Sequence, residues 1–309
     1  MNYSLLSRFR GAWLGSLIGQ QLANHNRLIT IREQKTSISE LAKPKSFWRS
    51  RQSRGAARST PEILSALQEQ FNVLETLRWE SIDSVSGQEY YLLAIFPVIM
   101  YYHDDWCSLS SFINQNRYSL QQSQKEIDNI LVWCYTVRLA LRGELVCCGL
   151  TERVVVGIGL KQTASIQWLK EVEMSCLNGL NSIQLAKKLS AMENGDLALS
   201  LFCVLQNPED FFLTIQQALF WEKQTTMITA LSGVLSGAYN GLTGIPVNWR
   251  NLSQNQDFYQ QITTKTENMI AEWLGIELTV NRGTLSSVIT SPRVLQPRSN
   301  LKIISQQEY

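Results

Sequence analysis

The sequence predicts an all-α protein folded as a single multi-helix domain. Apolar residues recur at spacings of three and four along most of the chain, and convincing strand-like alternation is absent. The 309 residues are 44% hydrophobic, which is enough apolar material for one sizeable core. Glycines also recur every fourth residue on two distant segments. These observations predict roughly ten packed helices.

The first predicted helix covers residues 3–23, where Leu6, Phe9, Trp13 and Leu17 follow a helical period. The second covers residues 62–78, and Pro61 with Glu62 gives it a favourable first turn. Residues 151–160 are rich in valine but contain two glycines, so the sequence there is compatible with either a helix or a strand. Further helices are predicted over residues 88–102, 108–115, 123–142, 165–177, 181–192, 195–206, 209–221, 225–241 and 257–274.

Two regions lack a helical period. Residues 27–59 carry nine basic residues against two acidic ones, and we expect a long, basic, partly mobile insertion in a helical domain of residues 1–278. Residues 279–309 are polar and punctuated by prolines, and we expect an extended C-terminal tail.

Composition excludes several classes of protein. A net charge of +2 identifies no partner, and six cysteines without a C-x-x-C pair beside two histidines give poor support for zinc. We expect buried, reduced thiols in a cytoplasmic protein. The longest apolar run, residues 90–102, is shorter than the ~20 residues of a membrane span and contains Pro97, so no span is expected.

The glycine stripes need a structural reason. Glycine inside a helix costs about 1 kcal/mol relative to alanine. A stripe of glycines removes side chains from one helix face, so that two backbones can approach closely. We therefore predict that the two helices that carry the stripes pack together. The stripes consist of Gly11, Gly15 and Gly19 on the first helix, and Gly233, Gly237 and Gly241 on the second.

These glycine motifs resemble the opening and closing signatures of the ADP-ribosylglycohydrolase family, over residues 10–23 and 231–249. Residues 92–105, with Pro97 and Asp104-Asp105, are similar to the family's central segment. The resemblance implies an orthogonal all-helical domain that removes ADP-ribose from modified side chains. It also implies a pair of Mg²⁺ or Mn²⁺ ions held by carboxylates.

The chain departs from the family's metal-binding pattern at all three places. Gln20 replaces the aspartate of the opening motif, and of Ser59, Thr60 and Glu62 only the last could bind a metal. Before the closing signature, the family's Asp, Asp and Thr fall on Gln224, Thr226 and Met227, with Lys223 beside them. We therefore expect no bound metal or other cofactor, no catalytic residues at these positions, and loss of metal-dependent hydrolysis.

Other clusters give weaker signals. His103-Asp104-Asp105 is the densest group of potential ligands, but it is interpreted as a solvated helix connection with a capping side chain. Asp104 and Asp105 are adjacent, which suits the two-sided attack of a glycosidase poorly. Gly157 and Gly159 lack the third glycine of a dinucleotide site.

The sequence favours a pseudoenzyme that acts as a binding or regulatory protein, with residual ADP-ribose binding left open. The expected partner is a protein that contacts the basic insertion or the tail. One alternative is a divergent, active ADP-ribosyl hydrolase. Another is binding of nucleic acid or an acidic protein by the basic insertion, where Phe47 and Trp48 lie among the charges.

Overall fold

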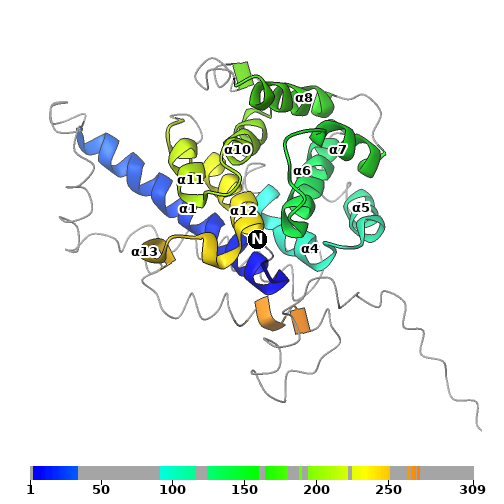
Figure 1. Cartoon of the computed structure of the whole chain (residues 1–309), viewed down its shortest axis with the longest axis horizontal. Coiled ribbons are helices and arrows are strands. Elements are labelled where there is room, and N and C mark those ends of the chain that lie inside the picture. The colour runs from blue at the N-terminus through cyan, green and yellow to red at the C-terminus, as the bar shows by residue number, and fades with distance from the viewer. Residues whose placement is uncertain are drawn as a thin grey trace, which may run out of the picture.

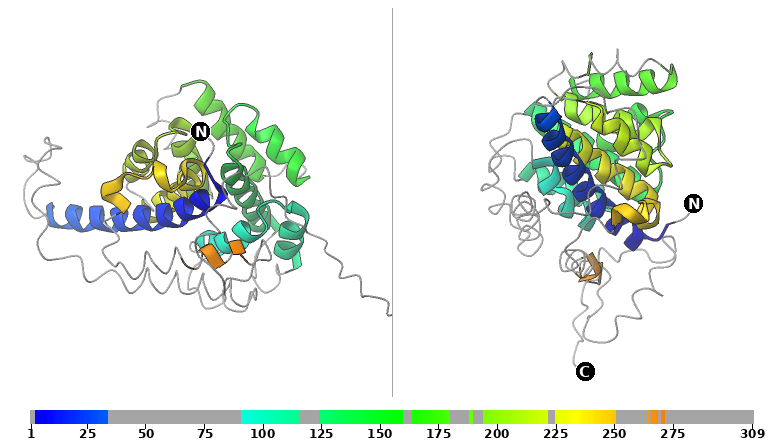
Figure 2. Two further views of the ribbon diagram at one scale, coloured as in Figure 1. Left: turned by 60° about the horizontal axis from the view of Figure 1, so that its bottom comes forward. Right: turned by 90° about the vertical axis from the view of Figure 1, so that its left-hand side faces the viewer.

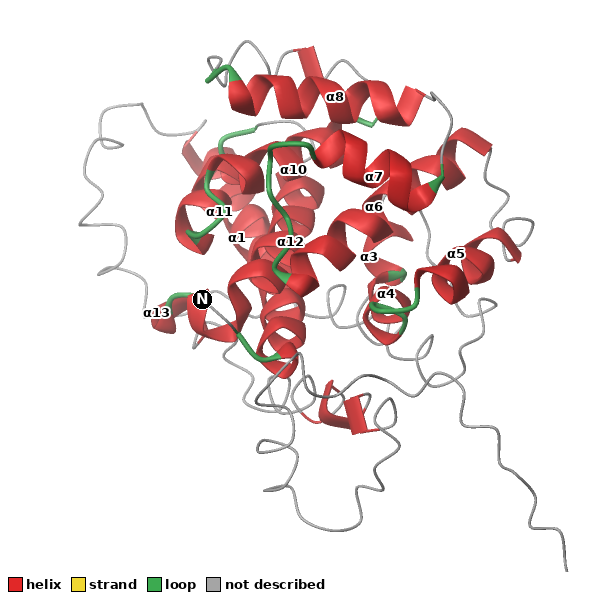
Figure 3. Cartoon of the chain, turned by 45° about the vertical axis from the view of Figure 1, so that its right-hand side comes forward, coloured by secondary structure: helices red, strands yellow, loops and turns green. Residues whose placement is uncertain are grey.

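The computed structural model of the chain describes helices and their connections (Figure 1). It describes residues 3–33, 91–115, 124–159, 164–179, 188–189, 194–221, 225–250, 264, 266–268 and 270–271. The helices are α1 (Leu5–Glu33), α3 (Tyr91–Ala94), α4 (Phe96–Tyr101), α5 (Trp106–Gln115), α6 (Gln124–Arg142), α7 (Leu150–Ile158), α8 (Ala164–Leu177), α10 (Gly195–Gln206), α11 (Phe211–Leu219), α12 (Thr225–Gly244) and α13 (Val247–Arg250). No strand occurs in these ranges, as Figure 3 shows, which confirms the predicted all-α class.

Two local predictions change in the structure. The helix predicted over residues 88–102 is interrupted, because Pro97 has no N–H to donate and instead lies in the first turn of α4. The ambiguous valine-rich segment is helix α7, which ends at Gly159 with a left-handed φ of 71°.

The first helix is longer than predicted. It extends past residue 23 to Glu33, because no proline or glycine interrupts the chain between residues 24 and 33. Residues 27–33 of the predicted insertion are therefore helical. The rest of that insertion, the predicted helix over 62–78 and the tail over 279–309 lie outside the described residues.

Helices α1 and α12 lie antiparallel and side by side (Figure 2), and their backbones touch along both glycine stripes. A Cβ atom on Gly233 would lie 2.5 Å from the carbonyl carbon of Gly15. A Cβ atom on Gly11 would lie 2.5 Å from the carbonyl carbon of Gly241. Real Cβ atoms do not approach other atoms so closely, so only glycine fits. The predicted packing of the two helices is confirmed.

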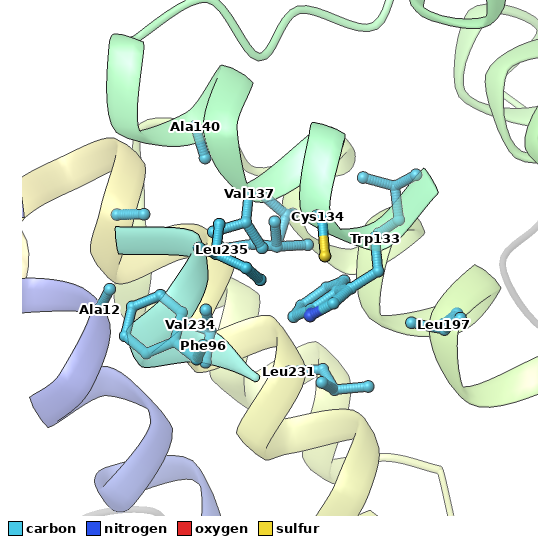
Figure 4. Close-up of a cluster of buried hydrophobic side chains, with 14 of the residues drawn as sticks. Ala12, Phe96, Trp133, Cys134, Val137, Ala140, Leu197, Leu231, Val234 and Leu235 are labelled. Atoms are coloured by element: carbon cyan, nitrogen blue, oxygen red, sulfur yellow. The ribbon is translucent and has the colours of Figure 1, made fainter. Parts of the chain in front are cut away.

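The main core surrounds this helix pair. Apolar side chains from α1, α4, α6, α10 and α12 form one buried cluster, part of which is drawn in Figure 4. Its buried indoles are hydrogen-bonded, as buried polar groups require. Trp133 Nε1 donates to the carbonyl of Leu92 at 3.1 Å, and Trp13 Nε1 lies 2.8 Å from the sulfur of Met100.

Arg8 fixes the end of this helix pair. Its buried guanidinium donates to the carbonyls of Ala140, Ala238 and Tyr239, at 3.0, 3.1 and 2.8 Å, so one side chain joins α1 to α6 and α12. Helix α12 bends nearby at Gly241, whose φ is 64° and ψ is −178°. The bend frees carbonyls that would otherwise bond within the helix, and Arg8 satisfies two of them.

Within the described residues, no helix is long and apolar enough to cross a membrane.

Replacing Gly15 by alanine is expected to destabilise the fold by about 3 kcal/mol, because the added methyl group meets backbone that cannot rotate away. This loss outweighs the roughly 1 kcal/mol that alanine gains in an isolated helix. Urea unfolding monitored by circular dichroism measures the difference. Gly159→Ala is the control, since its Cβ would meet nothing within 4 Å. The control should lose only about 1 kcal/mol, from the left-handed φ alone. Equal or greater stability of Gly15→Ala would refute the proposed role of the close contact.

Candidate functional site

Three of the positions predicted to align with the family's metal ligands, Gln20, Thr226 and Met227, lie at one end of the α1–α12 pair. A Cβ atom on Gly19 would lie 2.6 Å from the carbonyl carbon of Thr229. Gln20 follows Gly19 in α1, and Thr226 precedes Thr229 by three residues in α12. The antiparallel pairing therefore places Gln20 and Thr226 at the same end of the helix pair. Gln224, Ser59, Thr60 and Glu62 lie outside the described residues.

The three described side chains at these positions carry no formal charge. Gln20 is a buried amide, Thr226 is a half-buried hydroxyl, and Met227 is a thioether that is 6% exposed. Hard divalent cations prefer carboxylate oxygens, and neither an amide nor a hydroxyl supplies negative charge. These residues therefore do not fit a pair of divalent ions. Elsewhere in the described ranges, no group of three or more His, Cys, Asp or Glu side chains is arranged to hold a metal ion.

The His103–Asp105 segment forms a helix cap. The carboxylate of Asp105 accepts hydrogen bonds from Ser108 N at 3.0 Å and Ser108 Oγ at 2.6 Å, which begins α5. These bonds hold the pKa of Asp105 below its ordinary value. The predicted capping role is confirmed for Asp105.

His103 does not match the predicted solvated connection. It is buried, its ring packs edge-on against Phe9 with centroids 5.3 Å apart, and its Nδ1 lies 2.9 Å from the carbonyl of Met100. Burial lowers the pKa of His103, which favours the neutral ring. The segment therefore joins the core through its histidine and presents no cluster of free ligands.

The cysteines are all free thiols, but not all are buried. Cys134 and Cys203 are buried, as expected, whereas Cys107 and Cys148 are exposed. Cys147 in the α6–α7 connection and Cys176 in α8 are half-buried, and Cys147 contacts α8 at Glu173. The expectation of buried thiols therefore holds for only part of the set.

Sequence reasoning did not anticipate the contacts of the two arginines in the opening motif. Arg10 forms an ion pair with Glu267, which joins α1 to a segment close to the C-terminal end of the described residues. Arg8 binds main-chain carbonyls, as described above. A carbonyl occurs in every residue, so nothing in the sequence identifies those acceptors.

The described part of the chain is an all-α fold in which α1 and α12 touch directly at their glycines. The model of the ADP-ribosylglycohydrolase family matches residues 27–282, and the chain belongs to that family. The matched range starts within α1, after the first glycine stripe, and includes the basic segment. No curated protein matches the chain.

Replacing Asp105 by alanine is expected to lower the free energy of unfolding at pH 7 by about 1 kcal/mol, the usual contribution of a helix N-cap. The pKa of Asp105 is lower in the folded state than its ordinary 3.8, so the contribution is present above that pH and is lost as pH falls through the folded value. Urea titrations at neutral and acidic pH measure both effects.

Asp105→Asn is the matched control for this prediction. It keeps a capping oxygen but does not titrate, so it should retain most of the stability at pH 7. If Asp105→Ala and the unaltered chain unfold at the same urea concentration at pH 7, the cap does not stabilise α5.

Proposed function

We propose that this protein is a pseudoenzyme of the ADP-ribosylglycohydrolase family that acts as a binding or regulatory protein. The observation that supports this most directly is that Gln20, Thr226 and Met227, at the positions predicted to align with the family's ligand residues, are all uncharged. The scaffold itself does not depend on metal, because its helices are joined by glycine contacts and by Arg8.

Two divalent cations in a partly buried site lose much of their hydration, and only nearby negative charge compensates this loss. Two of the three ligand-bearing places have no carboxylate in this sequence, since position 20 is Gln and positions 224, 226 and 227 are Gln, Thr and Met. Lys223 adds a positive charge beside them. Metal-dependent hydrolysis of ADP-ribose linkages is therefore proposed to be lost.

Ligand recognition does not require this metal chemistry. Amide and hydroxyl groups donate and accept hydrogen bonds, and they suit a neutral polar ligand or the ribose hydroxyls of a nucleotide sugar. We propose ADP-ribose, bound without metal, as the small molecule to test first.

A protein partner is proposed to contact the basic segment and the C-terminal tail. Residues 27–59 carry nine basic side chains against two acidic ones, so an acidic protein surface is the complementary partner. The tail over 279–309 is proposed as a second contact, because it combines apolar residues with prolines.

Restoring carboxylates should restore metal binding if the missing charge is the reason for its loss. A triple variant with Gln20→Asp, Gln224→Asp and Thr226→Asp is expected to bind Mn²⁺ about tenfold or more tightly than the unaltered chain. Electron paramagnetic resonance of free Mn²⁺ measures the uptake directly. The matched control, Gln167→Asp with Gln206→Asp and Gln216→Asp, places the same charge on exposed positions of α8, α10 and α11.

Activity and ligand binding are tested on the unaltered chain. Release of ADP-ribose from modified arginine and serine, with Mg²⁺ or Mn²⁺, should not exceed the rate without protein. Metal-dependent turnover would instead establish a divergent, active hydrolase.

Stabilisation by ADP-ribose in a thermal-shift assay, equal with and without Mg²⁺, would support metal-free recognition.

Neutralising part of the basic segment should weaken binding of acidic partners. A variant with Lys43→Ser, Lys45→Ser, Arg49→Ser and Arg51→Ser is expected to lose about tenfold or more in affinity for a poly-glutamate peptide at low salt. Fluorescence anisotropy of the labelled peptide measures this loss.

The control for the basic segment replaces Lys125, Lys170, Arg142 and Lys188 by serine, which removes four exposed charges from the described helices. It should retain most of the affinity. An oligodeoxythymidylate of equal length distinguishes nucleic acid, because its binding would fall steeply with added salt. No binding of the peptide by the unaltered chain would contradict the proposed acidic partner.

A further inference from the structure

The connection between α6 and α7, residues 143–149, is held rigidly against its surroundings. Arg153 of α7 reaches back and donates to the carbonyl of Glu144 at 2.7 Å, and also to those of Val146, Cys148 and Gly149. Four carbonyls of this loop are thus satisfied by one guanidinium. The loop has a fixed conformation even though it belongs to no regular element.

Glu173 of α8 fastens this loop to the neighbouring helix. Its carboxylate accepts from Gly149 N at 2.7 Å and from Thr151 N at 2.9 Å, at the start of α7. Backbone amides at the start of a helix have no partner within it, and a carboxylate satisfies them well. The loop and α8 are therefore held in one arrangement by hydrogen bonds.

Two half-buried thiols lie at this contact. Cys147 Sγ donates to the carbonyl of Glu173 at 3.7 Å, which places this thiol against α8. Cys176 follows Glu173 by three residues, within one turn of that helix, and each of the two thiols affects the pKa of the other because they lie near each other. Both side chains are half-buried and pack on the main core. Among the described residues, no cluster around them could hold a metal, so metal binding does not explain the pair.

We propose that Cys147 and Cys176 form a site of reversible oxidation, in which a low-molecular-weight disulfide such as oxidised glutathione converts the two thiols into a disulfide that ties the α6–α7 loop to α8. A disulfide needs two cysteines whose Cβ atoms already lie close together and point toward each other. The hydrogen bonds donated by Arg153 and accepted by Glu173 hold the loop against α8, and so keep Cys147 beside the helix turn that carries Cys176.

The exchange occurs in two steps. The thiolate of Cys147 attacks one sulfur of oxidised glutathione, forms a mixed disulfide and releases one glutathione thiolate. The thiolate of Cys176 then attacks the sulfur of Cys147, forms the protein disulfide and releases the second glutathione. The protein loses two electrons and two protons, and both pass to the glutathione pair.

The environment of the two thiols determines the rate and the persistence of the disulfide. Burial raises the pKa of Cys147, and it raises that of Cys176 to about 12. Few thiolates are present at neutral pH, so oxidation is slow. The reduced pair also gains no stabilisation as a thiolate, so the disulfide resists reduction once it has formed.

The full-length chain is incubated with oxidised glutathione, quenched with acid, alkylated and digested with trypsin. We expect mass spectrometry to find the peptide of residues 143–153 joined to that of residues 171–187. The cross-link closes a loop in the unfolded chain, so Tm should rise by about 5 °C or more in the oxidised protein. Excess dithiothreitol should reverse both changes.

Single variants separate this pair from the other thiols. Cys176→Ser should remove the linked peptide and leave a glutathione adduct, whereas Cys148→Ser and Cys107→Ser, at exposed positions, should leave the cross-link intact. The proposal is wrong if the exposed cysteines become glutathionylated and no linked peptide forms at equilibrium. It is also wrong if Cys148→Ser abolishes the cross-link, because Cys148 would then be the partner of Cys176. Neither result bears on the metal and ADP-ribose measurements.

Discussion

The direct backbone contact between α1 and α12 is the constraint on which the rest of the structure depends. At Gly11, Gly15 and Gly233 a methyl group would overlap the facing main chain, so the two helices approach more closely than side chains would allow. Their pairing sets where α6, α10 and α11 pack, because each of these helices contacts α12. The same pairing determines which residues meet at its far end. Gln20 and Thr226 lie at the same end of the pair because the contact of Gly19 with Thr229 fixes how the two helices are aligned.

The contacts that hold the helices together are therefore distinct from the positions predicted to align with the family's metal ligands. The core is built from apolar side chains, glycine contacts and the carbonyls gathered by Arg8, none of which requires a bound ion. The proposed change from carboxylate to amide at position 20 would therefore alter what the site can bind without removing any of these packing contacts. In a fold stabilised by its metal ions, such a change would unfold the protein. Here the ligand positions can diverge while the helices stay in place.

The sequence predicted the features whose cause is local. The four-residue glycine spacing identified the helix pair. The loss of the family's ligand charges at Gln20 and Thr226 stays a prediction from residue identity. Features that depend on distant or nonspecific partners were not predicted. Arg8 binds main-chain carbonyls, which every residue has, so the sequence does not show which ones it will bind. Cys147 lies in a loop without a hydrophobic period.

The segment that contains His103 was expected to be a solvated helix connection, but a turn directs the ring of His103 toward Phe9. The break at Pro97 had a visible cause in the missing N–H, which outweighed the apolar run around it.

The distance along the chain between the two central helices also affects how the protein is made. Arg8 and its acceptor Ala238 are separated by 230 residues, so α1 leaves the ribosome long before α12 exists to cover it. Its apolar residues Leu14 and Ile18, which cluster with Phe211, Ile245 and Trp249, stay without these neighbours for most of that interval. Contacts of such long range form slowly and leave apolar surface exposed to aggregation while the chain grows. Synthesis of this protein should therefore depend on chaperones more than that of a helical bundle whose neighbouring helices are consecutive.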